Sequence, residues 1–305
     1  MFTENLLAGK TIFVTGGGTG LGYSMSRRFL ELGANVVIAS RRLEVLERAA
    51  DELRAADELR AADEQRAAEQ SAAGDARSSS RAEVVALRLD VRDPEAVAGA
   101  FDAAEERFGS IDALVNNAAG NFASPTERLS HRAFDAVLGI VLHGTVYATL
   151  ELGKRWIAQG RGGSVLSIAA TYAERGSGFV VPSAVAKAGV VSLTRSLAGE
   201  WGKHGIRLNA IAPGPFPTEG AWSRLMPTPE LQALFLGKVP LGRVGEHVEL
   251  ANLASFLLSD LAAYISGDLI YIDGAESVYN AGEFNALDSV SAEQWDQLAA
   301  LRAKG

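Results

Sequence analysis

The sequence has 305 residues, 48% of them hydrophobic and 22% charged, which is typical of a globular chain with a sizeable core. The absence of cysteine excludes disulfides and thiolate chemistry, and the four histidines lack zinc-ligand spacing, so we expect no metal. A net charge of −8 argues against nucleic-acid binding. The chain shows no uninterrupted apolar run of membrane-spanning length, no signal pattern and no peroxisomal C-terminal tripeptide, so we expect a cytoplasmic protein without a membrane segment.

The first predicted elements are a strand, a glycine-rich turn and a helix. Residues 10–15 (KTIFVT) are rich in β-formers, residues 16–22 contain five glycines, and residues 23–33 have a helical pattern. In this order a glycine turn indicates a dinucleotide site, because the backbone can approach the pyrophosphate at a helix N-terminus. A tight turn without a ligand is the alternative. The candidate cofactor contacts here are Gly16, Gly17, Gly18, Thr19, Gly20 and Leu21.

The second predicted strand, residues 35–39 (NVVIA), ends at a pair of arginines, Arg41 and Arg42. A site for NAD would place an acidic residue here to bind the ribose 2′-hydroxyl. Arginines suit a 2′-phosphate instead, so the sequence favours NADPH. The alternative is that both arginines are simply solvated.

An unusual repeat follows, in which AADELR occurs twice and AADEQR once within residues 44–70. Six residues advance a helix by about 240°, so Leu53 and Leu59 cannot share a face, which excludes a coiled coil or a long core helix. We expect a solvated helical extension and a flexible connector at residues 71–81. We assign no chemistry to this insert, residues 50–81.

The rest of the chain alternates predicted strands and helices. Five strands are expected at residues 83–89, 111–116, 164–170, 207–212 and 268–272, with long helices at residues 134–158 and 183–204. This pattern predicts a single-domain, Rossmann-type α/β fold: a doubly wound parallel sheet with helices on both faces and a tail from about residue 275. Ligands are then expected beyond the carboxyl ends of the strands.

A possible reacting pair lies near the middle of the chain. Tyr172 is in the loop after the strand at residues 164–170, and Lys187 lies on the helix that follows. Small apolar residues flank Lys187, so an interior position is favoured over a solvated one. Tyr172 as a surface aromatic, and Asn121 as a turn-capping amide, remain the alternatives.

Four ordered motifs together resemble the short-chain dehydrogenase/reductase family. They are TGGGTGLG at residues 15–22, NNAAG at 116–120, the helix of Lys187, and PGP at 213–215. The family's usual site contains Asn, Ser, Tyr and Lys. Only Lys187 matches it here, because Ser183, Ala170 and Val141 stand at the usual places of the tyrosine, serine and asparagine.

The segments at residues 118–130, 170–190, 213–225 and 283–287 look like one branch of that family, the NADPH-dependent 2,4-dienoyl-CoA reductases. The resemblance implies reduction of 2,4-dienoyl-CoA to trans-3-enoyl-CoA in the β-oxidation of unsaturated fatty acids. It implies that Tyr172 and Asn121 hold the thioester oxygen, while Lys187 holds the nicotinamide ribose and Ser183 adds a hydrogen bond.

The resemblance also assigns contacts and an assembly. For the cofactor it adds Arg41, Asp90, Val91, Asn117, Lys187, Pro213, Gly214, Pro215 and Phe216 to the glycine turn. For the acyl-CoA substrate it implies Arg41, Arg92, Phe122, Ser130 and Arg224. A homo-oligomer, by analogy a tetramer, is implied, and the apolar segments 255–260 and 270–273 are candidates for its interface.

Two other functions stay open. One is a different short-chain reductase acting on enoyl or 3-oxoacyl thioesters. The other is a non-catalytic dinucleotide-binding protein whose site has decayed.

Overall fold

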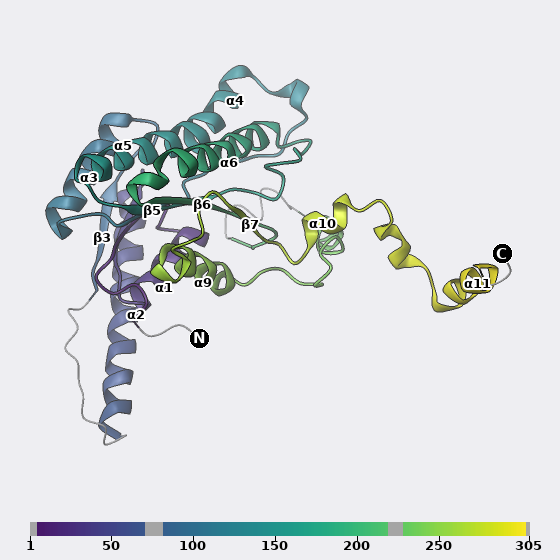
Figure 1. Ribbon diagram of the computed structural model, residues 1–305, viewed down its shortest axis with the longest axis horizontal. Helices are drawn as coiled ribbons and strands as arrows, with labels where there is room; N and C mark the ends of the chain where they lie inside the picture. Colours follow the sequence, from purple (N-terminus) through teal and green to yellow (C-terminus); the bar gives the residue numbers. More distant parts are fainter. Residues whose placement is uncertain (1–4, 71–81, 219–227, 303–305) are drawn as a thin grey trace.

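Short apolar runs form the strands, and most of their side chains are buried. TIFVT and ALVN are buried along their whole length, as in strands covered on both faces. The computed structural model describes residues 5–70, 82–218 and 228–302 (Figure 1). The strands are β1 (Thr11–Thr15), β2 (Asn35–Ser40), β3 (Val84–Arg88), β4 (Ala113–Asn116), β5 (Gly163–Ile168), β6 (Ile206–Pro213) and β7 (Leu269–Ile272).

These strands form one parallel sheet in the order β3-β2-β1-β4-β5-β6-β7. The chain starts at β1, adds β2 and β3 on one side, and then crosses to β4 on the other side. The switch between β1 and β4, where Val14 pairs with Val115, opens a crevice at the carboxyl ends of the strands. The predicted doubly wound, Rossmann-type sheet is confirmed.

Helices cover both faces of the sheet (Figure 1). One face packs on α1, α2 and α9, and the other on α3, α5 and α6. The main helices are α1 (Gly20–Glu31), α2 (Leu43–Gln70), α3 (Pro94–Phe108), α4 (His131–Leu138), α5 (Gly144–Ala158), α6 (Val181–Trp201), α8 (Pro229–Leu236), α9 (His247–Leu258), α10 (Glu276–Ala281) and α11 (Ala292–Arg302). Short 3₁₀ turns lie at Thr126–Arg128, Gly202–His204, Asp260–Ala262 and Asn285–Ser289.

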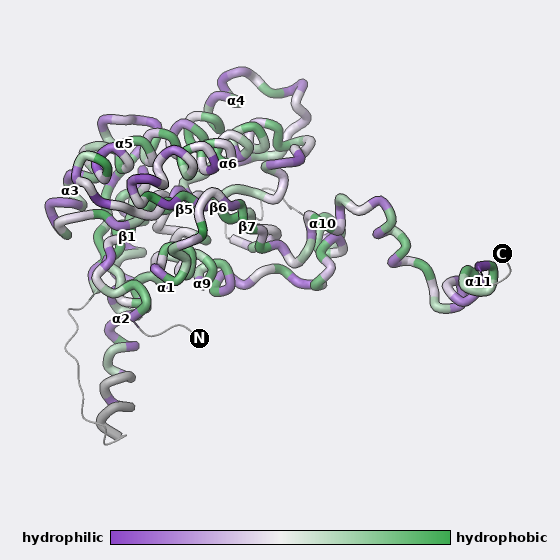
Figure 2. The backbone as a smooth tube through the Cα atoms, in the orientation of Figure 1, coloured by the Kyte–Doolittle hydropathy of each residue, from purple (hydrophilic) through white to green (hydrophobic). Residues whose placement is uncertain are grey.

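The repeat-containing segment is a single helix, α2, that leaves the body partway along its length (Figure 1). Leu53 is 1% exposed and packs in the core, whereas Leu59 is 70% exposed. The prediction that these leucines occupy different faces is confirmed. In Figure 2 the hydrophobic part of α2 lies where it meets α1 and the sheet. The expected connector, residues 71–81, lies outside the described residues.

The predicted helix 134–158 begins earlier, at His131, and is interrupted by a π-helical turn, Gly139–His143. Val141 lies in this turn and is 1% exposed. The prediction of one continuous helix therefore located the segment correctly. It did not anticipate the π-helical turn, which contains one more residue than an α-helical turn. π-Turns of this kind are frequent near functional sites.

The helical run His131–Ala158 has the length and hydropathy of a membrane span, although charged residues interrupt it. The expectation from uninterrupted apolar runs did not identify it. Core helices of globular proteins share these properties, and Ala148, Leu152 and Trp156 from this run are fully buried against the sheet. We interpret it as a core helix.

The apolar segment 255–260 belongs to the protein's own core. Leu257 and Leu258, in α9, are 1% and 2% exposed and pack with α1 and the sheet. The suggestion that this segment forms a subunit interface is therefore wrong for these two side chains. After β7 the chain runs through α10 into an arm that extends from the body and ends in α11 (Figure 1).

Trp156 links α5 to the sheet, so its truncation tests the core. Its side chain is fully buried, and its indole nitrogen donates to the Ile111 carbonyl over 2.7 Å. Trp156→Ala should lower the free energy of unfolding by about 3–5 kcal/mol, through lost burial and a cavity, measured by urea denaturation. The matched control is Trp295→Ala in α11, where the indole is 40% exposed and a change below about 1 kcal/mol is expected. Equal effects would contradict this description of the core.

Candidate functional site

The glycine-rich turn after β1 is shaped by close backbone contacts. Gly16 has φ of 68°, a left-handed conformation that favours glycine. A Cβ on Gly22 would lie 2.2 Å from the Gly16 carbonyl oxygen, so no larger residue fits there without a shift. The turn leads into the N-terminus of α1, whose partial positive charge and free N–H groups favour a phosphate. These residues therefore fit a dinucleotide pyrophosphate.

A cavity of about 170 Å³ adjoins this turn. It lies between the carboxyl ends of β1, β2 and β3 and the segment after β4. The predicted cofactor residues that line it are Gly16, Gly18, Thr19, Arg41, Asp90 and Val91. The sequence therefore identified residues that come together from three separate strand ends.

Four other predicted cofactor residues have mainly structural contacts. The Asn117 side-chain amide donates to the carbonyls of Thr15 and Gly16 over 3.0 and 3.1 Å, so it supports the glycine turn from behind. A Cβ on Gly17 would meet Ile38 at 2.7 Å, and Leu21 packs against the core. Gly20, with φ of 54°, begins α1.

The arginines differ in their partners. Arg92 forms an ion pair with Asp90 at 2.5 Å, and this hydrogen bond holds the pKa of the Asp90 carboxyl below its usual range. Arg41 is exposed at the mouth of the same cavity, and its charge also helps to lower that pKa. Arg41 is thus placed to meet an anion entering the cavity. Arg224 lies outside the described residues.

Tyr172 is the centre of a hydrogen-bonded group. Its hydroxyl oxygen lies 3.0 Å from the Ser183 hydroxyl, and the side-chain amide of Asn121 donates to it over 3.4 Å. Burial raises the pKa of the Tyr172 phenol, and the hydrogen bond to Ser183 opposes this rise. The phenol is therefore protonated at neutral pH and can donate a hydrogen bond to a developing oxyanion.

Lys187 lies one helical turn after Ser183 on α6 and is 7% exposed. Its ammonium group donates to the carbonyl of Ile168 at the end of β5. Burial lowers the pKa of Lys187 to about 8. The prediction that this lysine is interior rather than solvated is confirmed.

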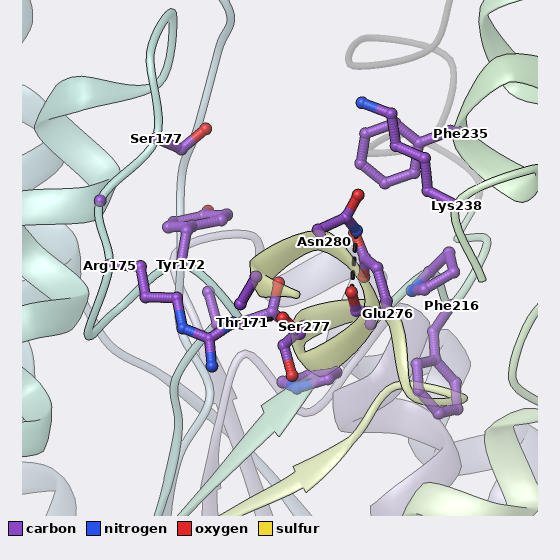
Figure 3. Close-up of a pocket in the computed structure, with 16 residues that line it drawn as sticks. Thr171, Tyr172, Arg175, Ser177, Phe216, Phe235, Lys238, Glu276, Ser277 and Asn280 are labelled. Carbon is purple, nitrogen blue, oxygen red and sulfur yellow. Dashed lines mark hydrogen bonds between the residues drawn. The ribbon is translucent and has the colours of Figure 1, made fainter. Parts of the chain in front are cut away.

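A larger cavity, of about 500 Å³, lies beside Tyr172 (Figure 3). The Tyr172 loop forms one wall, and α10 with the end of α8 forms the other. Four residues at and after the end of β6 that were predicted to contact the cofactor line this cavity rather than the smaller one: Pro213, Gly214, Pro215 and Phe216. A cavity of this volume that combines apolar walls with several polar side chains suits a small-molecule ligand.

Two predicted substrate residues have their own local contacts. Ser130 caps α4, accepting a hydrogen bond from the Ala133 amide over 3.2 Å. Phe122 packs against the small cluster of Val137 and Val141. Neither lines the larger cavity, so their roles toward a substrate stay predictions.

The sequence reasoning missed the opposite wall of the larger cavity. Phe235, Lys238, Glu276 and Asn280 line it (Figure 3). Glu276 is 8% exposed, and burial raises the pKa of its carboxyl. The available signal was positional, because Glu276 follows β7, and segments after parallel strands line the ligand crevice.

Comparison with known proteins agrees with this architecture. A family model described as enoyl-(acyl carrier protein) reductase matches residues 58–275, and one described as short chain dehydrogenase matches residues 10–72. The chain therefore belongs to the short-chain dehydrogenase family of α/β oxidoreductases.

Several curated relatives match over most of their length. An uncharacterised oxidoreductase of Caenorhabditis elegans is 46% identical, covering 95% of this chain and 87% of the relative. A probable (3E)-enoyl-CoA-producing 2,4-dienoyl-CoA reductase of the same organism is 43% identical, covering 92% and 84%. A probable (2E)-enoyl-CoA-producing 2,4-dienoyl-CoA reductase of Bacillus subtilis is 41% identical, covering 88% and 96%.

Solved structures share the fold. A short chain dehydrogenase from Bacillus anthracis is 37% identical with a TM-score of 0.73, covering 88% of this chain and 97% of that one. A putative 2-deoxy-D-gluconate 3-dehydrogenase from Agrobacterium tumefaciens, with bound NADP, is 30% identical with a TM-score of 0.75, covering 90% and 100%.

Arg41 offers a direct test of the smaller cavity. If its guanidinium meets a 2′-phosphate, Arg41→Ala should weaken NADPH binding by about 10–100-fold, as expected for loss of a hydrogen bond to a charged group. NADH binding should change little, because it lacks that phosphate. Fluorescence titration of both dinucleotides measures this. The control is Arg66→Ala, whose exposed side chain pairs with Asp63 on the projecting part of α2. An equal effect on both dinucleotides would contradict the assignment.

Proposed function

We propose that this protein catalyses the NADPH-dependent reduction of 2,4-dienoyl-CoA to trans-3-enoyl-CoA, a step in the β-oxidation of unsaturated fatty acids. The observation that carries the proposal is the group formed by Tyr172, Ser183 and Asn121, with hydrogen-bonding distances of 3.0 and 3.4 Å beside the larger cavity. Two relatives, at 43% and 41% identity, are named as probable 2,4-dienoyl-CoA reductases that produce (3E)-enoyl-CoA, and a third, at 41%, is named for the (2E) product.

The glycine turn, Arg41 and Lys187 would hold NADPH, which supplies the hydride when bound. The Tyr172 hydroxyl and the Asn121 amide would donate hydrogen bonds to the thioester oxygen. As the substrate accepts hydride at Cδ, the far end of its conjugated system, negative charge moves onto this oxygen. The resulting dienolate then takes up a proton from water at Cα, which gives the trans-3-enoyl product. Fixed donors at that position stabilise the transition state more than the ground state.

Lys187 and Ser183 support this arrangement from α6. Their positions one helical turn apart let Ser183 fix the phenol while the ammonium group favours negative charge nearby. The cavity walls formed by Pro215, Phe216 and Phe235 would exclude water from the acyl chain.

The alternative, reduction of a 3-oxoacyl thioester, needs a proton donor at the carbonyl being reduced. Ser183 stands where the family usually has its tyrosine, and an aliphatic hydroxyl is a weak acid for that step. A decayed site would not keep Tyr172 hydrogen-bonded and partly buried. We therefore favour the dienoyl substrate over both alternatives.

The remaining proposals rest on resemblance. We propose an acyl-CoA partner that contacts Arg92, Phe122, Ser130 and Arg224, a tetrameric assembly and a cytoplasmic location, although some relatives are named as peroxisomal enzymes.

Tyr172→Phe tests the proposal directly. Removal of one oxyanion donor should lower kcat for 2,4-hexadienoyl-CoA by about 10²–10³-fold, measured by NADPH consumption, while NADPH binding is unchanged. The matched control is Tyr264→Phe, because Tyr264 is fully exposed. Full activity of Tyr172→Phe, or wild-type turnover of a 3-oxoacyl thioester and not of the dienoyl thioester, would reject the proposal.

The pKa of Lys187 gives a pH prediction. With a pKa of about 8, the amine is charged below that pH and neutral above it. Because the charge favours the transition state, kcat/KM should fall as the pH rises through about 8. Lys187→Arg should abolish this fall in kcat/KM at high pH, since a guanidinium stays charged. Exposed Lys203 provides the control, because Lys203→Arg should leave the profile unchanged. A flat wild-type profile between pH 7 and 9 would contradict the role of this charge.

A further inference from the structure

Tyr172 is held differently from its neighbours in the site. Ser183 and Lys187 lie on α6, where helical hydrogen bonds fix their backbone. Tyr172 lies in the loop between β5, which ends at Ile168, and α6, which begins at Val181. Its hydroxyl nevertheless lies within 3.0 Å of the Ser183 hydroxyl. Contacts from outside the helix must therefore keep this loop in place.

Within the loop, two backbone hydrogen bonds form a tight turn around Tyr172. The Gly176 amide donates to the Tyr172 carbonyl over 2.8 Å, and the Ala173 amide donates to the Ala170 carbonyl over 3.0 Å. Gly176 has φ of 76°, which glycine adopts readily. These bonds set the shape of the turn and do not fix its position relative to α6.

Two residues within the turn, Glu174 and Arg175, connect it to the body of the protein. Glu174 accepts hydrogen bonds from the Tyr271 hydroxyl in β7 over 2.7 Å and from the Arg195 guanidinium in α6 over 2.6 Å. The neighbouring Arg175 donates to the carbonyl of Ser277 in α10. One carboxylate thus joins the loop to the helix that carries Ser183 and Lys187, and also to the edge strand of the sheet.

We propose that Glu174, with Tyr271 and Arg195, is the anchor that positions Tyr172, replacing the helical support that a tyrosine on α6 would have. The inference rests on the proposed catalytic role of Tyr172. It does not assign Glu174 any contact with substrate.

The charges at the anchor keep it intact at neutral pH. The hydrogen bonds from Tyr271 and Arg195 lower the pKa of the Glu174 carboxyl, and the charge of Arg175 adds to this. Burial and the hydrogen bond to Glu174 raise the pKa of Tyr271 to about 12. A carboxylate acceptor and a protonated phenol donor therefore coexist over the whole range in which the enzyme would work.

Removal of the carboxylate is the first test. Glu174→Ala should increase amide hydrogen exchange in residues 171–178 and lower kcat by about 10–100-fold, the scale expected when a reacting group is misplaced by about 1 Å. The KM for NADPH should not change. Glu174→Gln, which can still accept from Tyr271, should recover part of the loss. Asp63→Ala, which breaks the exposed Asp63–Arg66 pair on α2, is the matched control.

A double-mutant cycle separates positioning from general stabilisation. If Glu174 acts through the Tyr172 hydroxyl, Glu174→Ala should cause no further loss of kcat in a Tyr172→Phe background. Tyr271→Phe tests the same contact from β7 and should give a smaller increase in exchange, should Glu174→Ala not fold. Additive losses in the cycle, or unchanged exchange in both variants, would overturn the proposal.

The experiment also distinguishes the anchor from the proposed function. If wild type does not turn over the dienoyl thioester but the exchange of residues 171–178 rises in Glu174→Ala, the anchor is supported and the substrate assignment fails. If wild type is active and the exchange does not change, the anchor fails and the substrate assignment stands.

Discussion

The hydrogen bond between the hydroxyl groups of Tyr172 and Ser183 is the interaction on which the site depends. It joins a loop residue to a helix residue across 11 positions of sequence, and the phenol that it holds lines the larger cavity. With the phenol held here, the Asn121 amide donates to its hydroxyl, and Lys187 lies one helical turn beyond Ser183 on α6. Without this bond the Tyr172 ring would still line the cavity, but its hydroxyl would lose its fixed position relative to α6.

The arrangement also shows the fold presenting a phenol hydroxyl from a loop beside α6. α6 still supplies the interior lysine, and its turn before Lys187 still supplies a hydroxyl, from Ser183. The aromatic hydroxyl comes from the loop before that helix. The glycine turn and the ends of β2 and β3 thus line the smaller cavity, while the Tyr172 loop and α10 line the larger one.

Much of this could be predicted from the sequence, because the strands are short buried runs and the glycine turn has a fixed place after the first of them. The position of Arg41 followed from one rule, that the ends of parallel strands meet at one edge, whereas Asp90 and Val91 were implied by the family resemblance. Lys238 could not be predicted in this way, because its place in the cavity depends on where the end of α8 lies, whereas the same rule applied to the segment after β7 points to Glu276. The anchor at Glu174 was also unpredictable, since its partners Arg195 and Tyr271 are distant in sequence.

The projecting part of α2 has one more consequence. Leu53 and Asp57 are buried near the base of this helix, whereas Leu59 and Asp63 beyond them are exposed. Each six-residue unit adds about 9 Å of helix. Gain or loss of a unit in the exposed part would therefore change how far the rod reaches into solvent, while the sheet and both cavities stay as they are. The length of this rod is free to vary between otherwise equivalent proteins.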